Sequence, residues 1–525
     1  MTKITYVTMA AERKDEIHRE LDAARERVRS VFGATHPLYA GHRAILAGRT
    51  FADTSPADTR LLLGHFQEAR PQDVEAAVFA ARDAFPAWSR LAWQERLGAM
   101  RRVADGIRLH RWDLSVLMGF ECGKNRLECV GDVEESADLI DYYCDQIEQR
   151  NGFTLPMQAL GPSEHNSSVL RPYGVWTVIS PFNFPLALAA GPAGAAMAAG
   201  NTVVLKPASA TPWMALRLHE SARESGLPEG VLNVVTGGGR VAGQTLIAHA
   251  DVDGVVFTGS KEVGLRILRD NASRGIPRPV ITEMGGKNPA LVMPSADLDL
   301  ATDGVMRSAF GAQGQKCSAC SRAYLHRAVR DRFVEQLVEK TKRIRIGDPL
   351  DADIYMGPVI NEAAVRTFET AVARAVADGG RVLTGGRRLT EGPFAHGWFV
   401  EPTVIDGLPS DHCLFEEELF VPIVALALVG SFDQAIDLAN RTEYGLTAGI
   451  FSGDDSEVDK FFERIRAGVT YANRRAGATT GAWPGGQPVR RLEGERLERQ
   501  GLGRALLRPA VPARAEPRPR DPLKR

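Results

Sequence analysis

Several features are scarce in this 525-residue chain, and each scarcity excludes a class of protein. The chain has few cysteines, without the regular spacing of a disulfide framework. A zinc site built on CxxC pairs would need two pairs, and only Cys317–Cys320 is present, so we expect no metal site. A redox pair of the thioredoxin kind stays open as an alternative for these two residues. The six cysteines are Cys122, Cys129, Cys144, Cys317, Cys320 and Cys413.

The chain also lacks an excess of charge of one sign and a long hydrophobic run. Its 64 Lys and Arg nearly balance 65 Asp and Glu, so no overall field favours nucleic acid or an anionic membrane. The longest apolar stretch, residues 186–197, contains glycines and a proline and is too short to span a membrane. The charged N-terminus lacks the apolar core of a secretion signal. We therefore expect a cytoplasmic protein with no nucleic-acid or membrane partner.

What is present is the hydrophobic periodicity of a multidomain α/β protein. Residues 10–31 predict a surface helix, and residues 72–110 and 112–150 predict two long helices. From about residue 165, short apolar strands alternate with helical segments, which indicates a parallel sheet with crossover helices. A second unit of this kind covers about 290–470.

Two segments in glycine-rich turns carry the chemistry. Cys317 lies in FGAQGQKCS, and Glu283 lies in ITEMGGKN about thirty residues earlier. A thiolate can attack an aldehyde, the adduct can lose hydride to a nicotinamide, and a general base can help water to hydrolyse the resulting thioester. The alternatives are an inert buried cysteine and a solvated surface glutamate.

The same chemistry needs an oxyanion donor and a dinucleotide site. Asn183 stands between two prolines after a predicted strand, where a rigid amide suits an oxyanion, although a turn-forming Asn is the simpler interpretation. Lys206 ends another strand. A glycine turn at 236–243 follows a strand but does not fit the G-x-G-x-x-G pattern, so by itself it is a weak signal. A second strand, turn and helix start at 257–264 offers N–H groups to a pyrophosphate.

With these segments assembled, the chain resembles the aldehyde dehydrogenase superfamily from about residue 40 to 488. The resemblance rests on PFNFP, GNTVVLKP, FTGSKEVG, TEMGGKN, GQKCSA and EEELFVP. It implies Cys317 as nucleophile, Glu283 as general base and Asn183 as oxyanion amide. It also implies a cofactor site for NAD, in which Ser209, where many relatives have glutamate, leaves room for NADP. The residues implied in cofactor binding are Lys206, Ser209, Gly239, Thr258, Gly259, Ser260, Glu418 and Phe420.

The resemblance further implies an α/β fold of two doubly wound parallel-sheet domains with a small β oligomerisation segment, and thus a homo-oligomer. We expect an N-terminal helical segment at 1–40. The cofactor domain is expected at 41–150 and 173–289, the catalytic domain at 290–470, and the oligomerisation segment at 151–172 and 471–525.

Within the superfamily, the chain is most similar to the group that oxidises L-glutamate 5-semialdehyde to L-glutamate in proline breakdown. Three features support this: the serine after Cys317, the segment 131–143, and the segment 473–485, which resembles that group's aldehyde-anchoring loop. The similarity implies that Ser318 and the N–H groups of Gly481 and Ala482 bind the substrate carboxylate, while Phe184 lines its aliphatic part. The alternatives are another aldehyde as substrate, or a relative that no longer turns over.

The last stretch departs from this family. Residues 489–525 hold ten arginines and five prolines and no aromatic residue, a composition typical of a disordered basic tail. Residues 489–496 can be encoded GTT CGG CGG CTG GAA GGG GAG CGG, and reading one base later gives the family's Phe-Gly-Gly-Trp-Lys-Gly-Ser. We therefore hypothesise a frameshifted tail. It lacks the residues for the strand that relatives pair with a partner subunit, so weaker oligomerisation is expected.

Overall fold

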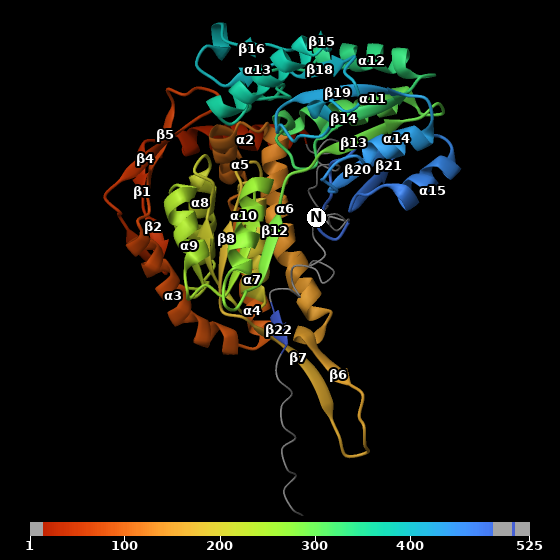
Figure 1. Cartoon of the computed structure of the whole chain (residues 1–525). Helices are drawn as coiled ribbons and strands as arrows, with labels where there is room; N and C mark the ends of the chain where they lie inside the picture. Colours follow the sequence, from red (N-terminus) through yellow and green to blue (C-terminus); the bar gives the residue numbers. More distant parts are fainter. Residues whose placement is uncertain (1–13, 487–506, 510–525) are drawn as a thin grey trace, which may run out of the picture.

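The computed structural model describes residues 14–486 and 507–509 and contains two seven-stranded sheets (Figure 1). The first has the order β12-β11-β8-β9-β10-β2-β3. Its five strands from β12 to β10 run parallel, and the β2–β3 hairpin joins them antiparallel. The strands are β2 (Leu38–Ala40), β3 (Arg43–Ile45), β8 (Val175–Ile179), β9 (Thr202–Lys206), β10 (Leu232–Val234), β11 (Gly254–Thr258) and β12 (Val280–Glu283).

Crossover helices connect the parallel strands, as the alternating pattern predicted. Strands β8, β9 and β11 are buried almost throughout, which explains why they are apolar runs and not alternating patterns. The predicted boundary between residues 40 and 41 falls inside the β2–β3 hairpin, so Leu38–Ala40 pairs within this sheet. The helices are α7 (Ala187–Ala198), α8 (Pro212–Glu224), α9 (Gln244–Ala248) and α10 (Lys261–Ala272).

The sequence predicted two long helices, over 72–110 and 112–150, but the structure divides this region into four helices, so the predicted number was wrong. The first break is at Leu91, where the backbone leaves the helical conformation for an extended one. The second is at Gly123, whose left-handed conformation (φ 77°) ends the helix before it. Asn125 then begins the next helix, because its side chain accepts from the backbone N–H of Glu128. The four are α3 (Pro71–Arg90), α4 (Trp93–Leu109), α5 (Arg111–Cys122) and α6 (Arg126–Glu148); the N-terminal helix is α2 (Lys14–Arg29).

The second sheet has the order β15-β18-β19-β14-β13-β20-β21, and only β15 runs antiparallel to its neighbour. Together the two sheets confirm the predicted α/β fold with two doubly wound parallel units. The strands are β13 (Asn288–Val292), β14 (Cys320–His326), β15 (Arg381–Thr384), β18 (Thr403–Asp406), β19 (Ile423–Val429), β20 (Thr447–Phe451) and β21 (Val469–Ala472). The helices are α11 (Leu298–Phe310), α12 (Arg330–Lys342), α13 (Glu362–Ala377), α14 (Phe432–Ala439) and α15 (Asp455–Arg464).

Smaller β elements complete the fold. The hairpin of β6 (Thr154–Met157) and β7 (Asn166–Pro172) projects from the body, as Figure 1 shows. Strand β22 (Leu507–Pro509) pairs antiparallel with β7. Both strands belong to the same chain, so the expected loss of the strand that pairs with a partner subunit stays a prediction. The frameshift hypothesis concerns residues 489–525, of which the structure describes only 507–509. The remaining strands are β1 (Ala34–His36), β4 (Thr50–Thr54), β5 (Leu62–Gln67), β16 (Arg388–Leu389) and β17 (Phe399–Val400).

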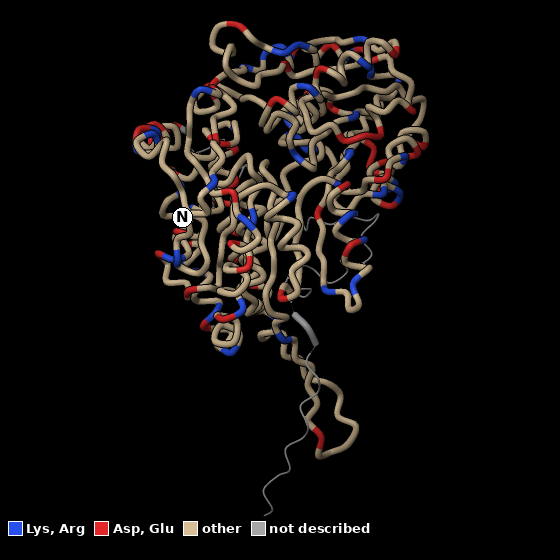
Figure 2. Tube along the Cα trace, turned by 60° about the vertical axis from the view of Figure 1, so that its left-hand side comes forward, with Lys and Arg blue, Asp and Glu red and all other residues tan. Residues whose placement is uncertain are grey.

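The charged residues are spread over the molecule. In Figure 2, basic and acidic residues are interspersed over the molecule, in keeping with the balanced composition. Over residues 14–486 and 507–509, no helix has both the length and the apolar character needed to cross a membrane.

Candidate active site

One cavity of about 1640 Å³ lies where the carboxyl ends of the first sheet's strands face the second sheet. Ligand sites in open α/β sheets form at this edge, because polar loops converge there. Most residues expected from the sequence to act line this cavity: Asn183, Phe184, Lys206, Thr258, Gly259, Ser260, Glu283, Cys317, Ser318, Glu418, Phe420, Gly481 and Ala482. Two do not, Ser209 and Gly239, which are exposed on neighbouring loops.

The turn before Cys317 is fixed by its neighbours. Ala312 and Gln313 both have positive φ, of 45° and 58°, a strained conformation that persists only when surroundings hold it. The backbone N–H of Ala312 donates to Glu128 (2.7 Å), and the side chain of Gln313 donates to the carbonyl of Gly123 (3.1 Å). Both partners belong to the first domain, so the first domain positions the turn that presents the thiol.

The two glycines of ITEMGGKN allow three functional segments to meet. A Cβ atom on Gly286 would lie 2.1 Å from the carbonyl oxygen of Cys317, and one on Gly285 would lie 1.7 Å from Oε2 of Glu418. The N–H of Gly286 donates to Glu418 (2.8 Å), and Asn288 donates to the carbonyl of Cys317 (2.8 Å). A larger residue at position 286 would therefore displace the backbone of Cys317, and a larger residue at position 285 would displace the carboxylate of Glu418.

Glu283 ends β12, directly beside the loop expected to bind pyrophosphate. It pairs with Thr258 across the two strands, and the N–H of Gly259 donates to its carbonyl oxygen (3.0 Å). Ser260 follows as the N-cap of α10, and its own side chain makes no cap hydrogen bond. The first N–H groups of this helix are therefore available to an anionic ligand.

Lys206 lies at the end of β9 and is only 4% exposed. Its Nζ donates to the carbonyl of Pro207 (2.8 Å), and burial lowers the pKa of the amine to about 8. Ser209, three residues on, donates to the carbonyl of Gly237 (3.1 Å) and so joins the loop after β9 to the glycine-rich loop after β10 at the rim of the site. These groups could hold the ribose and phosphates of a dinucleotide, and the uncapped helix beside them fits that use.

Asn183 is 5% exposed, and its side-chain amide donates to the carbonyl of Gln315 (2.9 Å). A primary amide has a second N–H group, which an oxyanion formed at Cys317 could accept from. Gln315 in turn accepts from the N–H of Ile360 (3.0 Å). The amide is thus held by the same turn that carries the thiol.

A buried ion pair that sequence reasoning missed lies under this loop. Lys124 and Asp132 have side chains 1% and 0% exposed, with 2.8 Å between Nζ and Oδ2. The same Nζ donates to the carbonyl of Asn183 (3.2 Å) and lies 3.8 Å from the ring centre of Phe184. Although burial disfavours the ammonium, the carboxylate of Asp132 outweighs it and raises the pKa of Lys124. The sequence signal was one lysine and one acid at helix-like spacing, which is too common to be informative.

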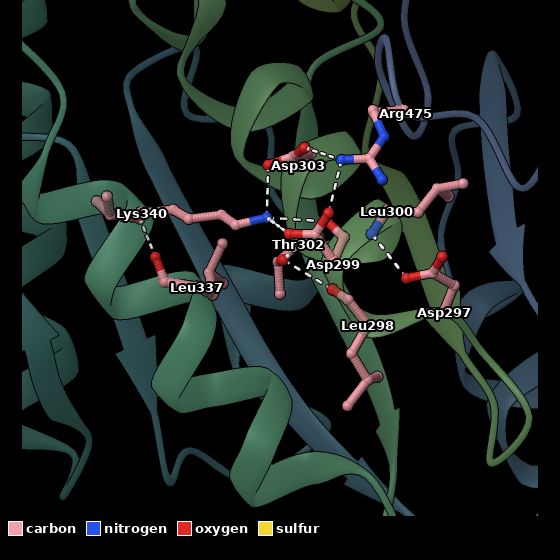
Figure 3. A network of polar contacts seen from close by, with 10 residues as sticks. Asp297, Leu298, Asp299, Leu300, Thr302, Asp303, Leu337, Lys340 and Arg475 are labelled. Atoms are coloured by element: carbon pink, nitrogen blue, oxygen red, sulfur yellow. Dashed lines mark hydrogen bonds and ion pairs between the residues drawn. The ribbon is translucent and has the colours of Figure 1, made fainter.

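The anchoring segment is tied to the second domain. Arg475 and Lys340 both contact the carboxylates of Asp299 and Asp303 on α11, as Figure 3 shows. The distances to Asp299 are 2.8 Å from each of these basic groups. Arg475 and Asp299 are exposed, whereas Lys340 and Asp303 are only 21% and 18% exposed. Because solvent screens half of the network, we expect it to contribute more to orientation than to stability. It fixes the start of the segment beside the helix that leads into the nucleophile turn.

Glu135 also lines the cavity, although the sequence predicts no role for it. Burial raises the pKa of Glu135 to about 8. It is therefore mostly protonated at neutral pH and can lie beside a carboxylate-bearing ligand with little repulsion.

The redox-pair alternative for Cys317 and Cys320 finds little support in the structure. None of the six cysteines, all of which lie in the described residues, forms a disulfide, and burial raises the pKa of Cys320 to about 12, so it stays a thiol. Within the described residues, no group of three or more His, Cys, Asp or Glu could hold a metal ion.

Comparison with known proteins agrees with this geometry. The aldehyde dehydrogenase family model matches residues 46–487. A 1-pyrroline-5-carboxylate dehydrogenase from Geobacillus sp. (strain WCH70) is 37% identical over 491 residues, covering 92% of each chain.

Among solved structures, a 1-pyrroline-5-carboxylate dehydrogenase from Thermus with bound NAD superposes with a TM-score of 0.88 at 32% identity, over 94% of this chain and 96% of that one. Proline utilization A from Bdellovibrio bacteriovorus gives 0.89 at 33% identity over 95% of this chain, which spans only 52% of that longer protein.

Proposed function

Because this chain belongs to the aldehyde dehydrogenase family, we propose that it oxidises L-glutamate 5-semialdehyde to L-glutamate with NAD as the hydride acceptor. One observation carries the proposal: Cys317 and Glu283 line the same cavity as Ser318, Gly481 and Ala482, the residues that would donate hydrogen bonds to the carboxylate of the substrate. The relatives named 1-pyrroline-5-carboxylate dehydrogenase support the same substrate. 1-Pyrroline-5-carboxylate is the cyclic form of L-glutamate 5-semialdehyde.

Each step is assigned to a residue of the cavity. Cys317 attacks the aldehyde carbon, and the second N–H of Asn183 stabilises the resulting oxyanion. NAD, when bound, supplies the hydride-accepting ring, and Lys206, Ser260 and Glu418 are the residues that would hold it. Loss of hydride leaves a thioester on Cys317. Glu283 then removes a proton from water, which hydrolyses the thioester.

The substrate end needs donors for a carboxylate without a strong cation beside the thiolate. Backbone N–H groups meet this need, since they bind an anion through oriented dipoles. Gly481 has φ of +99°, a conformation that favours glycine. The backbone carbonyl of Gly481 accepts from the guanidinium of Arg474 (2.9 Å). With that carbonyl turned toward Arg474, the loop can direct its N–H groups toward the cavity.

An aldehyde panel tests the proposed substrate. We expect kcat/KM for L-glutamate 5-semialdehyde to exceed that for butanal, which lacks the carboxylate, by at least about a hundredfold, as two or three hydrogen bonds to a charged group would give. NADH formation at 340 nm measures both rates. Equal values for the two aldehydes would contradict the carboxylate-anchor assignment and leave only the family-level activity.

The cofactor rim gives a second prediction. Ser209→Glu should lower kcat/KM for NADP at least tenfold while changing that for NAD less than threefold, because a carboxylate beside the adenosine ribose repels a 2′-phosphate. Ser209→Gln has the size without the charge and is the matched control. The prediction is wrong if the Glu and Gln variants show the same ratio of NADP to NAD activity.

A further inference from the structure

The anchoring loop is held at its far end by a tryptophan. The indole Nε1 of Trp483 donates to Oδ2 of Asp138 on α6 (2.8 Å). The other oxygen of Asp138 accepts from Arg108 on α4 (2.8 Å), and the Asp138 side chain is only 4% exposed. The guanidinium of Arg108 fixes the buried carboxylate that accepts from the indole of Trp483. Because the acceptor is charged, this hydrogen bond is stronger than one between neutral groups.

The near end of the loop is fixed beside the nucleophile. The hydroxyl of Thr479 donates to the carbonyl of Ser318 (2.6 Å), and the N–H of Thr479 donates to the hydroxyl of Ser308 on α11 (3.1 Å). Thr479 and Ser308 are fully buried. The donors Gly481 and Ala482 therefore lie between two fixed points, one attached to the thiol's own segment and one attached to α6.

The same helix holds the opposite wall of the cavity. Asp132, six residues before Asp138, accepts from the N–H of Ala187 (2.8 Å) and binds Lys124, which in turn donates to the carbonyl of Asn183. Six residues correspond to about 9 Å along a helix. One rigid helix thus spaces the loop that stabilises the oxyanion from the loop that receives the far end of the substrate.

We propose that Asp138 and Trp483 are positioning residues that hold the N–H groups of Gly481 and Ala482 in place relative to the Cys317 thiol, and so determine the affinity for an aldehyde that carries a carboxylate. This inference rests on the proposed function, because it assumes that Gly481 and Ala482 bind a carboxylate. Neither residue reacts; both act through the loop between Thr479 and Trp483.

Removing the hydrogen bond between Trp483 and Asp138 tests the proposal. In Trp483→Phe, KM for L-glutamate 5-semialdehyde should rise about tenfold, with kcat within threefold and both constants for butanal unchanged. Asp138→Ala should behave in the same way. Asp138→Asn keeps an acceptor for the indole and should restore most of the affinity. Asp141→Ala is the matched control, because Asp141 shares Arg108 (2.7 Å) on the same helix and makes no hydrogen bond to Trp483.

The outcomes separate the two levels of the argument. If the wild-type enzyme shows no preference for the carboxylate-bearing aldehyde, the proposed function fails, and this inference fails with it. If the preference exists but Trp483→Phe matches Asp141→Ala, only the positioning role is wrong. An equal loss of kcat on butanal and on the semialdehyde would show a general structural role and would also overturn the proposal.

Discussion

Cys317→Ala should abolish aldehyde oxidation, lowering kcat by on the order of 10⁴-fold or more, because it removes the thiol on which the proposed thioester forms. The geometry supports so large an effect. The backbone that carries the thiol lies against Gly286 at a distance that admits no side chain, and Asn288 holds its carbonyl, so the structure fixes the position of Cys317. NADH formation with the purified variant measures the loss.

Cys320→Ala is the matched control for this experiment. Cys320 is three residues away and fully buried in β14, and its thiol donates weakly to the carbonyl of Arg322 (3.5 Å), away from the reaction. The control should keep kcat within a few-fold of the wild type. Quenching of protein fluorescence by NAD would show that both variants still bind cofactor. Turnover that survives in Cys317→Ala would refute the covalent mechanism and, with it, the proposed function.

Lys124→Met should have the second largest effect, destabilising the fold by roughly 3–5 kcal/mol, because it leaves the Asp132 carboxylate buried without its cation. It also removes the donor to the Asn183 carbonyl and the cation over the Phe184 ring. We expect kcat to fall by about tenfold or more as the oxyanion amide loses its fixed position. Thermal unfolding and steady-state kinetics measure the two effects.

A double variant separates stability from positioning. In Lys124→Met with Asp132→Asn, a neutral amide replaces the carboxylate and can still accept from the N–H of Ala187, so much of the stability should return, whereas the Asn183 carbonyl still lacks its donor and kcat should stay low. Arg101→Met breaks an exposed contact with Asp145 and Glu148 and should change stability by less than about 1 kcal/mol. Recovery of both stability and kcat in the double variant would show that the lysine does not position Asn183.

The sequence by itself determined the α/β class and the chemistry-bearing segments. Buried parallel strands such as β8 and β9 need unbroken apolar residues, and the glycines beside Glu283 and Cys317 are needed wherever backbones approach closely, so both features appear as local patterns. Helix number was harder to predict, since α5 ends through the conformation of one residue, Gly123, within an otherwise helical pattern.

The tertiary structure alone decided how the cavity is held together. Lys124 with Asn183 and Trp483 with Asp138 join segments 59 and 345 positions apart, and no local pattern of residues marks such contacts. The same holds for the placing of Ser209 and Gly239 at the rim instead of in the cavity wall, because it depends on how far each loop extends beyond its strand. Local sequence specifies which groups can react, while long-range packing specifies the distances between them.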